Sequence, residues 1–192
     1  MIKAIIFDCF GVLATDELLP FLHQHFDKDP ARLQKAMDMC RQVDAGSLDY
    51  DGYIAAIAAM AGVSERIAHQ QIDANAPDVR LFAYIQDVLR PRYRLGLLSN
   101  AGRNWLNDIF TSDQLALFDA TQLSYEAGVL KPEPRAYTLM AERLRVERHE
   151  CVLVDDQERY VAGAQAAGMQ AILYRQFEPL PRELEVICSG ST

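Results

Sequence analysis

The sequence contains few cysteines and none of the cysteine spacings that build a metal or disulfide site. The 192-residue chain has four, at Cys9, Cys40, Cys151 and Cys188, and no two of them form a CxxC pair. This spacing argues against a zinc site and against a disulfide framework. We therefore expect reduced thiols that are buried as small apolar groups.

Positive charge and long apolar runs are also scarce. Lysine and arginine number 19 against 27 aspartates and glutamates, which gives a formal net charge of −8. This balance disfavours nucleic acid and anionic membranes as general partners, although one local cation can still hold a small anionic substrate. No apolar segment reaches membrane-spanning length, and the apolar N-terminus is interrupted by Asp8 with no signal-peptide cleavage site after it. We expect a cytoplasmic protein, either a monomer or a homodimer.

What the sequence does contain is an alternation of short apolar runs with helical patterns. The runs predict buried strands over residues 3–7, 94–99, 120–124, 151–155 and 169–174. Helical patterns lie between them over residues 79–89, 103–110, 134–144 and 158–168. Pro134 suits a helix start and Gly168 a helix end. The alternation predicts an α/β fold with a Rossmann-like parallel sheet.

Residues 15–78 break this alternation. Four amphipathic helical patterns follow one another there without a strand, over residues 16–26, 30–46, 49–62 and 64–75. They predict a helical insertion after the first strand. The expected domains are an α/β core made of residues 1–14 and 79–192 and a helical cap made of residues 15–78.

Polar residues follow several of the predicted strands. Ligands of open parallel sheets bind beyond the carboxyl ends of the strands. The residues that fall there are Asp8, Ser99, Asn100, Asp155 and Asp156, and Lys131 lies in a loop before a helix. Because four separate segments supply them, we interpret them as one site rather than as unrelated turns.

Four motifs in this order resemble the haloacid dehalogenase superfamily: FDCFGVL, LLSNAG, LKPEPRAY and VLVDDQERYVAGAQAAGMQAI. The resemblance covers nearly the whole chain, and the insertion is similar to the small helical cap of subfamily I. It implies that Asp8 is a nucleophile, because a carboxylate can form a covalent intermediate. It also implies that Ser99 and the backbone N–H of Asn100 bind a phosphate, and that Lys131 neutralises both the nucleophile and the transferred group.

The same resemblance implies a Mg²⁺ site. Asp8, Asp156 supported by Asp155, and the main-chain carbonyl of Phe10 would hold the ion. Three carboxylates that face a single lysine favour a divalent cation for an independent reason, since one ammonium cannot balance them.

Phe10 stands where phosphatases of this superfamily usually carry a second aspartate. That aspartate protonates the leaving alcohol and then activates water, and positioned acid–base catalysis is typically worth about 10²–10⁴-fold. Phe10 leaves three hypotheses open. The first is a Mg²⁺-dependent phosphatase with an altered acid–base group. The second is a metal-independent 2-haloacid dehalogenase, whose halide leaving group needs no proton, and the third is a non-catalytic phosphate- or metal-binding regulatory protein.

The predicted carboxylate cluster favours the phosphatase, because phosphoryl transfer uses a cation to offset charge. We expect a small phosphate monoester as the substrate, and the resemblance makes a sugar phosphate a reasonable candidate.

Substrate choice is expected to lie in the cap. Asp16, His23 and His25 follow the nucleophile loop and are candidates to face the substrate, although Asp16 also suits a helix N-cap. Another group, Tyr50, Tyr53 and Met60, is expected to belong to the interior of the cap.

Overall fold

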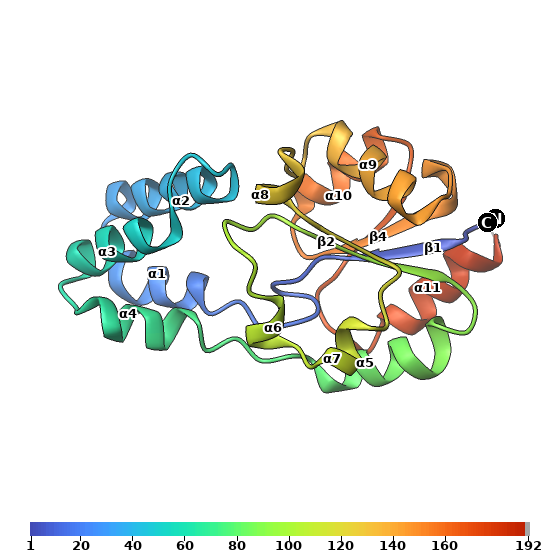
Figure 1. The fold of residues 1–192 in the computed structure, drawn as a ribbon, viewed down its shortest axis with the longest axis horizontal. Coiled ribbons are helices and arrows are strands. Elements are labelled where there is room, and N and C mark those ends of the chain that lie inside the picture. Colours follow the sequence, from blue (N-terminus) through green and yellow to red (C-terminus); the bar gives the residue numbers. More distant parts are fainter. Residues whose placement is uncertain (191–192) are drawn as a thin grey trace.

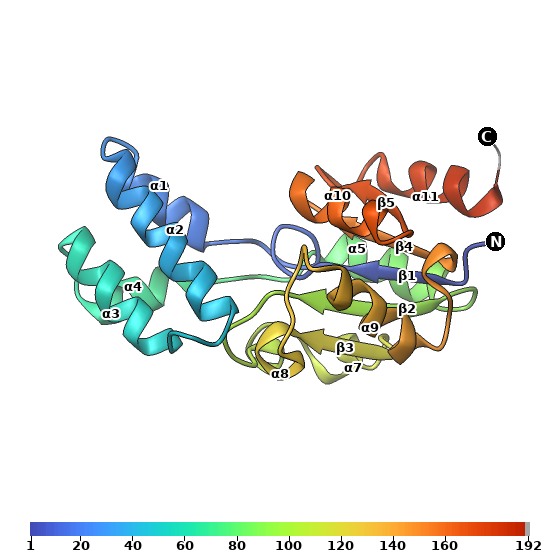
Figure 2. The same cartoon turned by 90° about the horizontal axis from the view of Figure 1, so that it is seen from above.

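The structure, a computed structural model, describes residues 1–190 and is built around a sheet of five parallel strands. The strands lie in the order β3-β2-β1-β4-β5 (Figure 2). Their bounds are β1 Ala4–Phe7, β2 Arg94–Ser99, β3 Ala120–Leu123, β4 Cys151–Asp155 and β5 Gln170–Leu173. The predicted parallel α/β sheet is therefore confirmed. β2 and β4 have their predicted bounds, and the other strands are one or two residues shorter than predicted.

The register of the central strands places the predicted site residues together. Phe7 of β1 aligns with Leu97 of β2 and with Val154 of β4. The next residues, Asp8 and Asp155, therefore lie side by side at the carboxyl edge of the sheet.

Helices cover both faces of the sheet (Figure 1). One face is covered by α5 (Val79–Tyr84), the π-helical turn η1 (Ile85–Leu89) and α11 (Leu180–Ser189), and the other by α9 (Pro134–Leu144) and α10 (Glu158–Ala166). Ile5 and Val152 pack toward the first set, whereas Ile6 and Leu153 pack toward the second. The strands are apolar on both faces because each face is buried.

Short helices connect the remaining elements. One of these helices differs from its predicted extent. The predicted helix over residues 103–110 is reduced to α6, Leu106–Ile109. It begins late because the Asn104 side chain accepts a hydrogen bond from the backbone N–H of Leu106 at 3.1 Å, which ends the preceding loop. The other short elements are α7 (Ser112–Leu115), α8 (Ser124–Ala127) and η2 (Arg148–Glu150).

The helical insertion after β1 consists of α1 (Leu18–Phe26), α2 (Pro30–Asp44), α3 (Tyr50–Ala61) and α4 (Glu65–Ile72). We call these four helices the insertion; they form a separate lobe beside the sheet (Figures 1 and 2). Asp29, Asp49 and Ser64 cap the N-termini of α2, α3 and α4, each by accepting a backbone N–H. The insertion buries its own apolar cluster, centred on Phe26 and Ile57, apart from the two clusters of the sheet.

Two chain segments join the insertion to the sheet, and they pair with each other. The backbone N–H of Thr15 donates to the carbonyl of Ala76 at 2.9 Å, and the N–H of Asp78 donates to the carbonyl of Leu13 at 2.9 Å. These bonds tie the exit and the return of the chain into one two-stranded connection.

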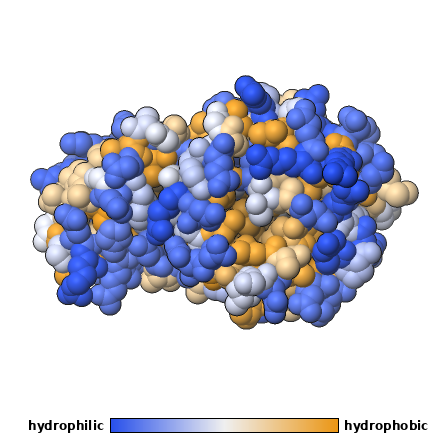
Figure 3. All heavy atoms as spheres, viewed as in Figure 1, coloured by the Kyte–Doolittle hydropathy of each residue, from blue (hydrophilic) through white to orange (hydrophobic). Residues whose placement is uncertain are grey.

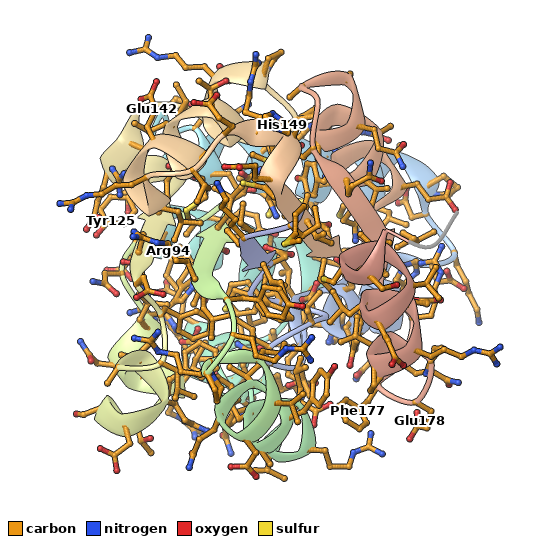
Figure 4. The ribbon with its side chains drawn as sticks, turned by 90° about the vertical axis from the view of Figure 1, so that its right-hand side faces the viewer. Arg94, Tyr125, Glu142, His149, Phe177 and Glu178 are labelled. Carbon is orange, nitrogen blue, oxygen red and sulfur yellow. The ribbon has the colours of Figure 1, made fainter. Side chains whose placement is uncertain are left out.

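The opposite end of the sheet carries polar groups with structural partners (Figure 4). Arg94, at the start of β2, donates to the carbonyl of Leu144 at 3.0 Å, and Lys3 forms an ion pair with Glu150. On the face seen in Figure 3, hydrophilic side chains cover most of both lobes, with a more apolar area toward the middle. No helix within residues 1–190 combines the length and the apolarity that crossing a membrane requires.

Candidate active site

A cavity of about 190 Å³ lies between the carboxyl edge of the sheet and the insertion. Its walls include most of the residues predicted for the site: Asp8, Phe10, Ser99, Asn100, Lys131 and Asp156. Asp155 lies behind this wall and is completely buried. The fold therefore brings together all the segments that the sequence placed at this edge.

Lys131 is buried between two carboxylates. Its Nζ lies 2.8 Å from Oδ1 of Asp8 and 2.5 Å from Oδ2 of Asp155. The ring of Tyr160 lies 4.7 Å from the same Nζ, as measured to the ring centroid. The ammonium thus has two opposite charges and an aromatic face around it, which compensates the loss of water on burial.

Asn100 holds the loop that carries Lys131. Its side-chain Oδ1 accepts from the backbone N–H of Lys131 at 2.8 Å, and its Nδ2 donates to the Lys131 carbonyl at 2.9 Å. The side chain of Asn100 is therefore used to join two loops. Ser99, which is also buried, donates its hydroxyl to the carbonyl of Asn100 at 3.2 Å.

Asp8, Asp155 and Asp156 form a cluster of carboxylates. One oxygen from each lies within 4.8 Å of the others. Asp155 is held by Lys131 and by the backbone N–H of Gln157, which donates to its Oδ1 at 2.9 Å. Carboxylate oxygens gathered in this way suit a hard divalent cation such as Mg²⁺.

Gly11 allows the loop after β1 to approach this cluster. Its φ is +77°, a conformation that favours glycine. A Cβ at this position would lie 2.6 Å from Oδ2 of Asp156. The internal hydrogen bonds of the loop use the carbonyls of Cys9 and Ala14, not the carbonyl of Phe10. The Phe10 carbonyl is therefore not used in the hydrogen bonding of the loop.

The charges of the cluster are out of balance without a cation. Burial raises the pKa of Asp8 to about 7; Lys131 opposes this increase, and Asp155 adds to it. Burial also raises the pKa of Asp156. For Lys131, burial lowers the pKa, but the two neighbouring carboxylates more than reverse this and raise it above its ordinary value. Lys131 is therefore charged, and the residues present fit a divalent cation that would let Asp8 ionise.

Phe10 forms part of an aromatic wall. Its ring meets the ring of Trp105 edge-on, with the centroids 5.1 Å apart. Trp105 also contacts Tyr50 of the insertion, and the guanidinium of Arg103 lies 4.9 Å from the Tyr50 ring centroid. Sequence reasoning missed Arg103 and Trp105, because both were assigned to a regular helix that does not form there.

Of the three residues predicted to face the substrate, Asp16 lines the cavity and the two histidines do not. Asp16 lines the cavity, and its Oδ1 also accepts from the backbone N–H of Leu18 at 3.0 Å, as an N-cap does. His23 is exposed and pairs with Asp27. His25 packs within the insertion, 4.6 Å from the Phe21 ring centroid.

Of the three residues expected in the interior of the insertion, two lie there as predicted and the third also faces the cavity. Tyr53 is buried there, and Met60 packs against the same cluster. The prediction for Tyr50 was incomplete, because this residue also lines the cavity. Its hydroxyl donates to Asp73 at 2.5 Å, which turns the ring toward Trp105.

Two residues of α10, Arg159 and Tyr160, reach the cavity without having been predicted, and so does Asp44 of α2. Arg159 donates to the hydroxyl of Tyr160 at 2.9 Å, and that hydroxyl accepts from Asn100 at 3.1 Å. Asp44 comes from the last turn of α2. A single acidic residue at a helix end carries no signal that distinguishes it from a surface residue.

Comparisons with known proteins identify the family and agree with the fold. A family model for haloacid dehalogenase-like hydrolases matches residues 2–168. The chain is 32% identical over 113 residues to phosphatase MT3486 of Mycobacterium tuberculosis, a match that covers 56% of this chain and 50% of that protein. The chain thus spans about half the length, or less, of the curated relatives it matches.

Solved structures share the fold. The HAD family enzyme bt-2542 of Bacteroides thetaiotaomicron has a TM-score of 0.75 at 22% identity, over 95% of this chain and 98% of that one. The same enzyme is known in complex with magnesium and inorganic phosphate. L-2-haloacid dehalogenase of Xanthobacter autotrophicus has a TM-score of 0.64 at 22% identity, over 100% of this chain and 84% of that one.

Proposed function

This chain belongs to the haloacid dehalogenase-like hydrolases, and within that family we propose that it is a Mg²⁺-dependent phosphatase that acts on a small phosphate monoester. The observation that most directly supports this proposal is that Lys131 is buried between Asp8 and Asp155. Asp156 completes a cluster of three carboxylates there. One cation from the protein and one from solution would balance this cluster and leave a place for a phosphate dianion.

Asp8, Asp156 and the carbonyl of Phe10 would hold Mg²⁺, and Asp155 would support them from behind. When bound, the ion would offset charge on the transferred phosphoryl group. Asp155 has one oxygen on Lys131 and the other on the N–H of Gln157, which suits a supporting role. Only Oδ1 of Asp8 pairs with Lys131, and its Oδ2 makes no hydrogen bond or ion pair with residues 1–190.

The proposed reaction begins with attack by Asp8 on phosphorus. A buried carboxylate with one oxygen held by Lys131 is oriented for such an attack and sheltered from water. Lys131 would stay protonated and bind both the nucleophile and the phosphoryl oxygens. The Ser99 hydroxyl and the backbone N–H of Asn100 would donate to the remaining phosphoryl oxygens.

The insertion would act as the cap predicted for residues 15–78, closing the cavity over a core of residues 1–14 and 79–192. A volume of about 190 Å³ is small beside the ~300–1,000 Å³ of pockets for drug-sized ligands. It therefore favours a compact substrate such as a sugar phosphate.

Two buried donors in the aromatic wall support an oxygen-bearing substrate. Nε of Arg103 and Nε1 of Trp105 have no hydrogen-bond partner among residues 1–190. Unpaired buried N–H groups are costly, so a substrate hydroxyl or carboxylate that accepted from them would gain affinity.

A haloacid dehalogenase is the second candidate, favoured by Phe10, since halide leaves without a proton. The three clustered carboxylates count against it, because a 2-haloacid would bring a further negative charge and no cation.

The deciding experiment is hydrolysis of p-nitrophenyl phosphate with Mg²⁺, using wild-type protein and Asp8→Asn. We expect steady release of nitrophenolate from wild type and none from the variant. Release that is equal in the two proteins would remove Asp8 as the nucleophile. Release of halide from a 2-haloacid, without phosphatase activity, would establish the dehalogenase. Binding of phosphate without turnover of either substrate would establish a regulatory protein.

A further inference from the structure

Phe10 leaves the proposed phosphatase without a second carboxyl group on the loop that carries Asp8. We propose that Asp44, at the end of α2, supplies the missing general acid and base from the insertion. This inference rests on the proposed function and names a catalytic residue for it.

The end of α2 is docked on the loop that follows β2. The hydroxyl of Ser124, at the start of α8, donates to the carbonyl of Asp44 at 2.7 Å and accepts from the N–H of Ala101 at 2.9 Å. Gly102 lies so close to Val43 that a Cβ on it would fall 2.0 Å from the Val43 Cγ1. Figure 1 shows α2 ending near α8. Asp44 is thus fixed beside the segment that carries the proposed phosphate-binding residues.

The other carboxylates of the cavity are already engaged. The aspartates that line it are Asp8, Asp16, Asp44, Asp73, Asp108 and Asp156. Two of these belong to the metal cluster. Asp16 is held by the backbone N–H groups of α1. Asp73 and Asp108 are both ion-paired with Arg103. Asp16 is tied by its Oδ1 to the start of α1, and proton transfer at Asp73 or Asp108 would compete with an existing ion pair.

Asp44 is the exception. Its side chain is half-buried, and it makes no hydrogen bond or ion pair with residues 1–190. Charged and titratable groups face it from several elements, namely Lys131, Arg159, Asp16, Cys40, Tyr53 and Tyr160. Burial raises the pKa of Asp44 to about 6, although Lys131 and Arg159 oppose the increase. A carboxyl group that titrates near neutrality can both give and take a proton there.

The position of Asp44 also fits the direction of the reaction. Phosphoryl transfer places the attacking and leaving oxygens roughly in line. Asp8 attacks from the sheet side of the cavity, so the leaving oxygen points toward the insertion, where Asp44 lies. A group on the insertion is therefore on the correct side to protonate it.

The two steps balance in atoms and charge. In the first, an Asp8 oxygen bonds to phosphorus, the bond from phosphorus to the leaving oxygen breaks, and the Asp44 proton moves to that oxygen. In the second, the ionised Asp44 takes a proton from water, the water oxygen bonds to phosphorus, and the bond to Asp8 breaks. The alcohol and hydrogen phosphate leave, and Asp44 is protonated again.

The test compares two aryl leaving groups, p-nitrophenoxide and the more basic phenoxide. For Asp44→Asn, we expect kcat/KM for phenyl phosphate to fall about 100-fold and kcat/KM for p-nitrophenyl phosphate to fall less than tenfold. The phosphorylated protein should also accumulate in intact-mass spectra, because the base for the second step is lost. Asp51→Asn, an exposed acid on α3, is the matched control and should behave as wild type.

Equal losses for the two substrates, or no loss, would overturn the role of Asp44 and leave the phosphatase proposal standing. Wild-type protein that hydrolyses neither substrate would overturn both proposals.

Discussion

The two walls of the cavity differ in whether their buried charged groups have partners. On the sheet side, Lys131 is fully buried, and its ammonium touches two carboxylates. On the insertion side, Asp44 is half-buried and its carboxylate touches no partner among residues 1–190. The first arrangement is a closed network, and the second is a single group that can change its protonation state.

This difference follows from what each wall rests on. A buried ion pair is tolerated only when its geometry is accurate, because desolvation costs several kcal/mol per ion. Neighbouring strands β1 and β4 give that accuracy by their register. The insertion packs around its own apolar cluster and meets the sheet lobe through two linkers and the end of α2. We infer that the sheet side holds the phosphoryl group and the insertion governs proton transfer and substrate choice.

Breaking the network on the sheet side should have the largest effect. Lys131→Met leaves Asp8 and Asp155 buried without their cation, so we expect the free energy of unfolding to fall by about 3–5 kcal/mol in urea titrations without Mg²⁺. Lys35→Met, on the exposed face of α2, is the control and should change it by less than about 0.5 kcal/mol. A loss below 1 kcal/mol for Lys131→Met would show that the network is not a closed electrostatic unit.

Binding of Mg²⁺ to the carboxylates on the sheet side should stabilise the protein and thereby distinguish this wall from the insertion side. At a Mg²⁺ concentration near 100 times its Kd, binding adds about 2.7 kcal/mol, or roughly 5–10 °C in the melting temperature of a chain this long. Asp156→Asn should abolish this shift in a thermal melt. Glu158→Gln, at an exposed acid two residues after Asp156, should retain it. A shift that survives in Asp156→Asn would place the ion elsewhere.

The pH dependence of stability should reveal the free carboxylate on the insertion side. Burial raises the pKa of Asp44 to about 6, above the ordinary value near 4, so the folded state binds more protons than the unfolded state between these values. The free energy of unfolding therefore falls as the pH rises through this window.

Asp44→Asn removes that contribution. Between pH 5 and pH 7.5 we expect wild type to lose about 1 kcal/mol more stability than the variant, as measured by urea unfolding. Parallel curves for the two proteins would mean that Asp44 is solvated like a surface aspartate.

The smallest expected effect concerns the aromatic wall between the two sides. Trp105→Phe keeps a ring against Phe10 but removes the Nε1 donor together with part of the ring surface. We expect KM for a hexose phosphate to rise about 2–10-fold with kcat unchanged, because one hydrogen bond is worth about 0.5–1.5 kcal/mol. KM for p-nitrophenyl phosphate, whose body offers no hydroxyl, serves as the internal control. Equal changes for both substrates would point to lost packing instead.

The parallel sheet, the four helices of the insertion and the meeting of the site segments could be predicted, because each depends on local pattern. The strand at residues 151–155 is an apolar run followed by two acids, and its bounds were predicted correctly. The helix over residues 103–110 was predicted wrongly at its start. Apolar spacing cannot indicate the hydrogen bond from the Leu106 N–H to the Asn104 side chain. Nor can it indicate the contact between Trp105 and Tyr50, which comes from a distant segment.

By itself, the sequence determined the sheet and its carboxyl edge, since alternating apolar runs and helices leave few ways to bury both faces. Through its resemblance to the haloacid dehalogenase superfamily, it also predicted that Phe10 stands where phosphatases of that superfamily usually carry an aspartate. Only the tertiary structure decided that Asp44 stands free in the cavity while Asp16, Asp73 and Asp108 are engaged. Whether an aspartate is buried or paired depends on which segments meet in space. The sequence does not indicate this, because all aspartates look alike along the chain.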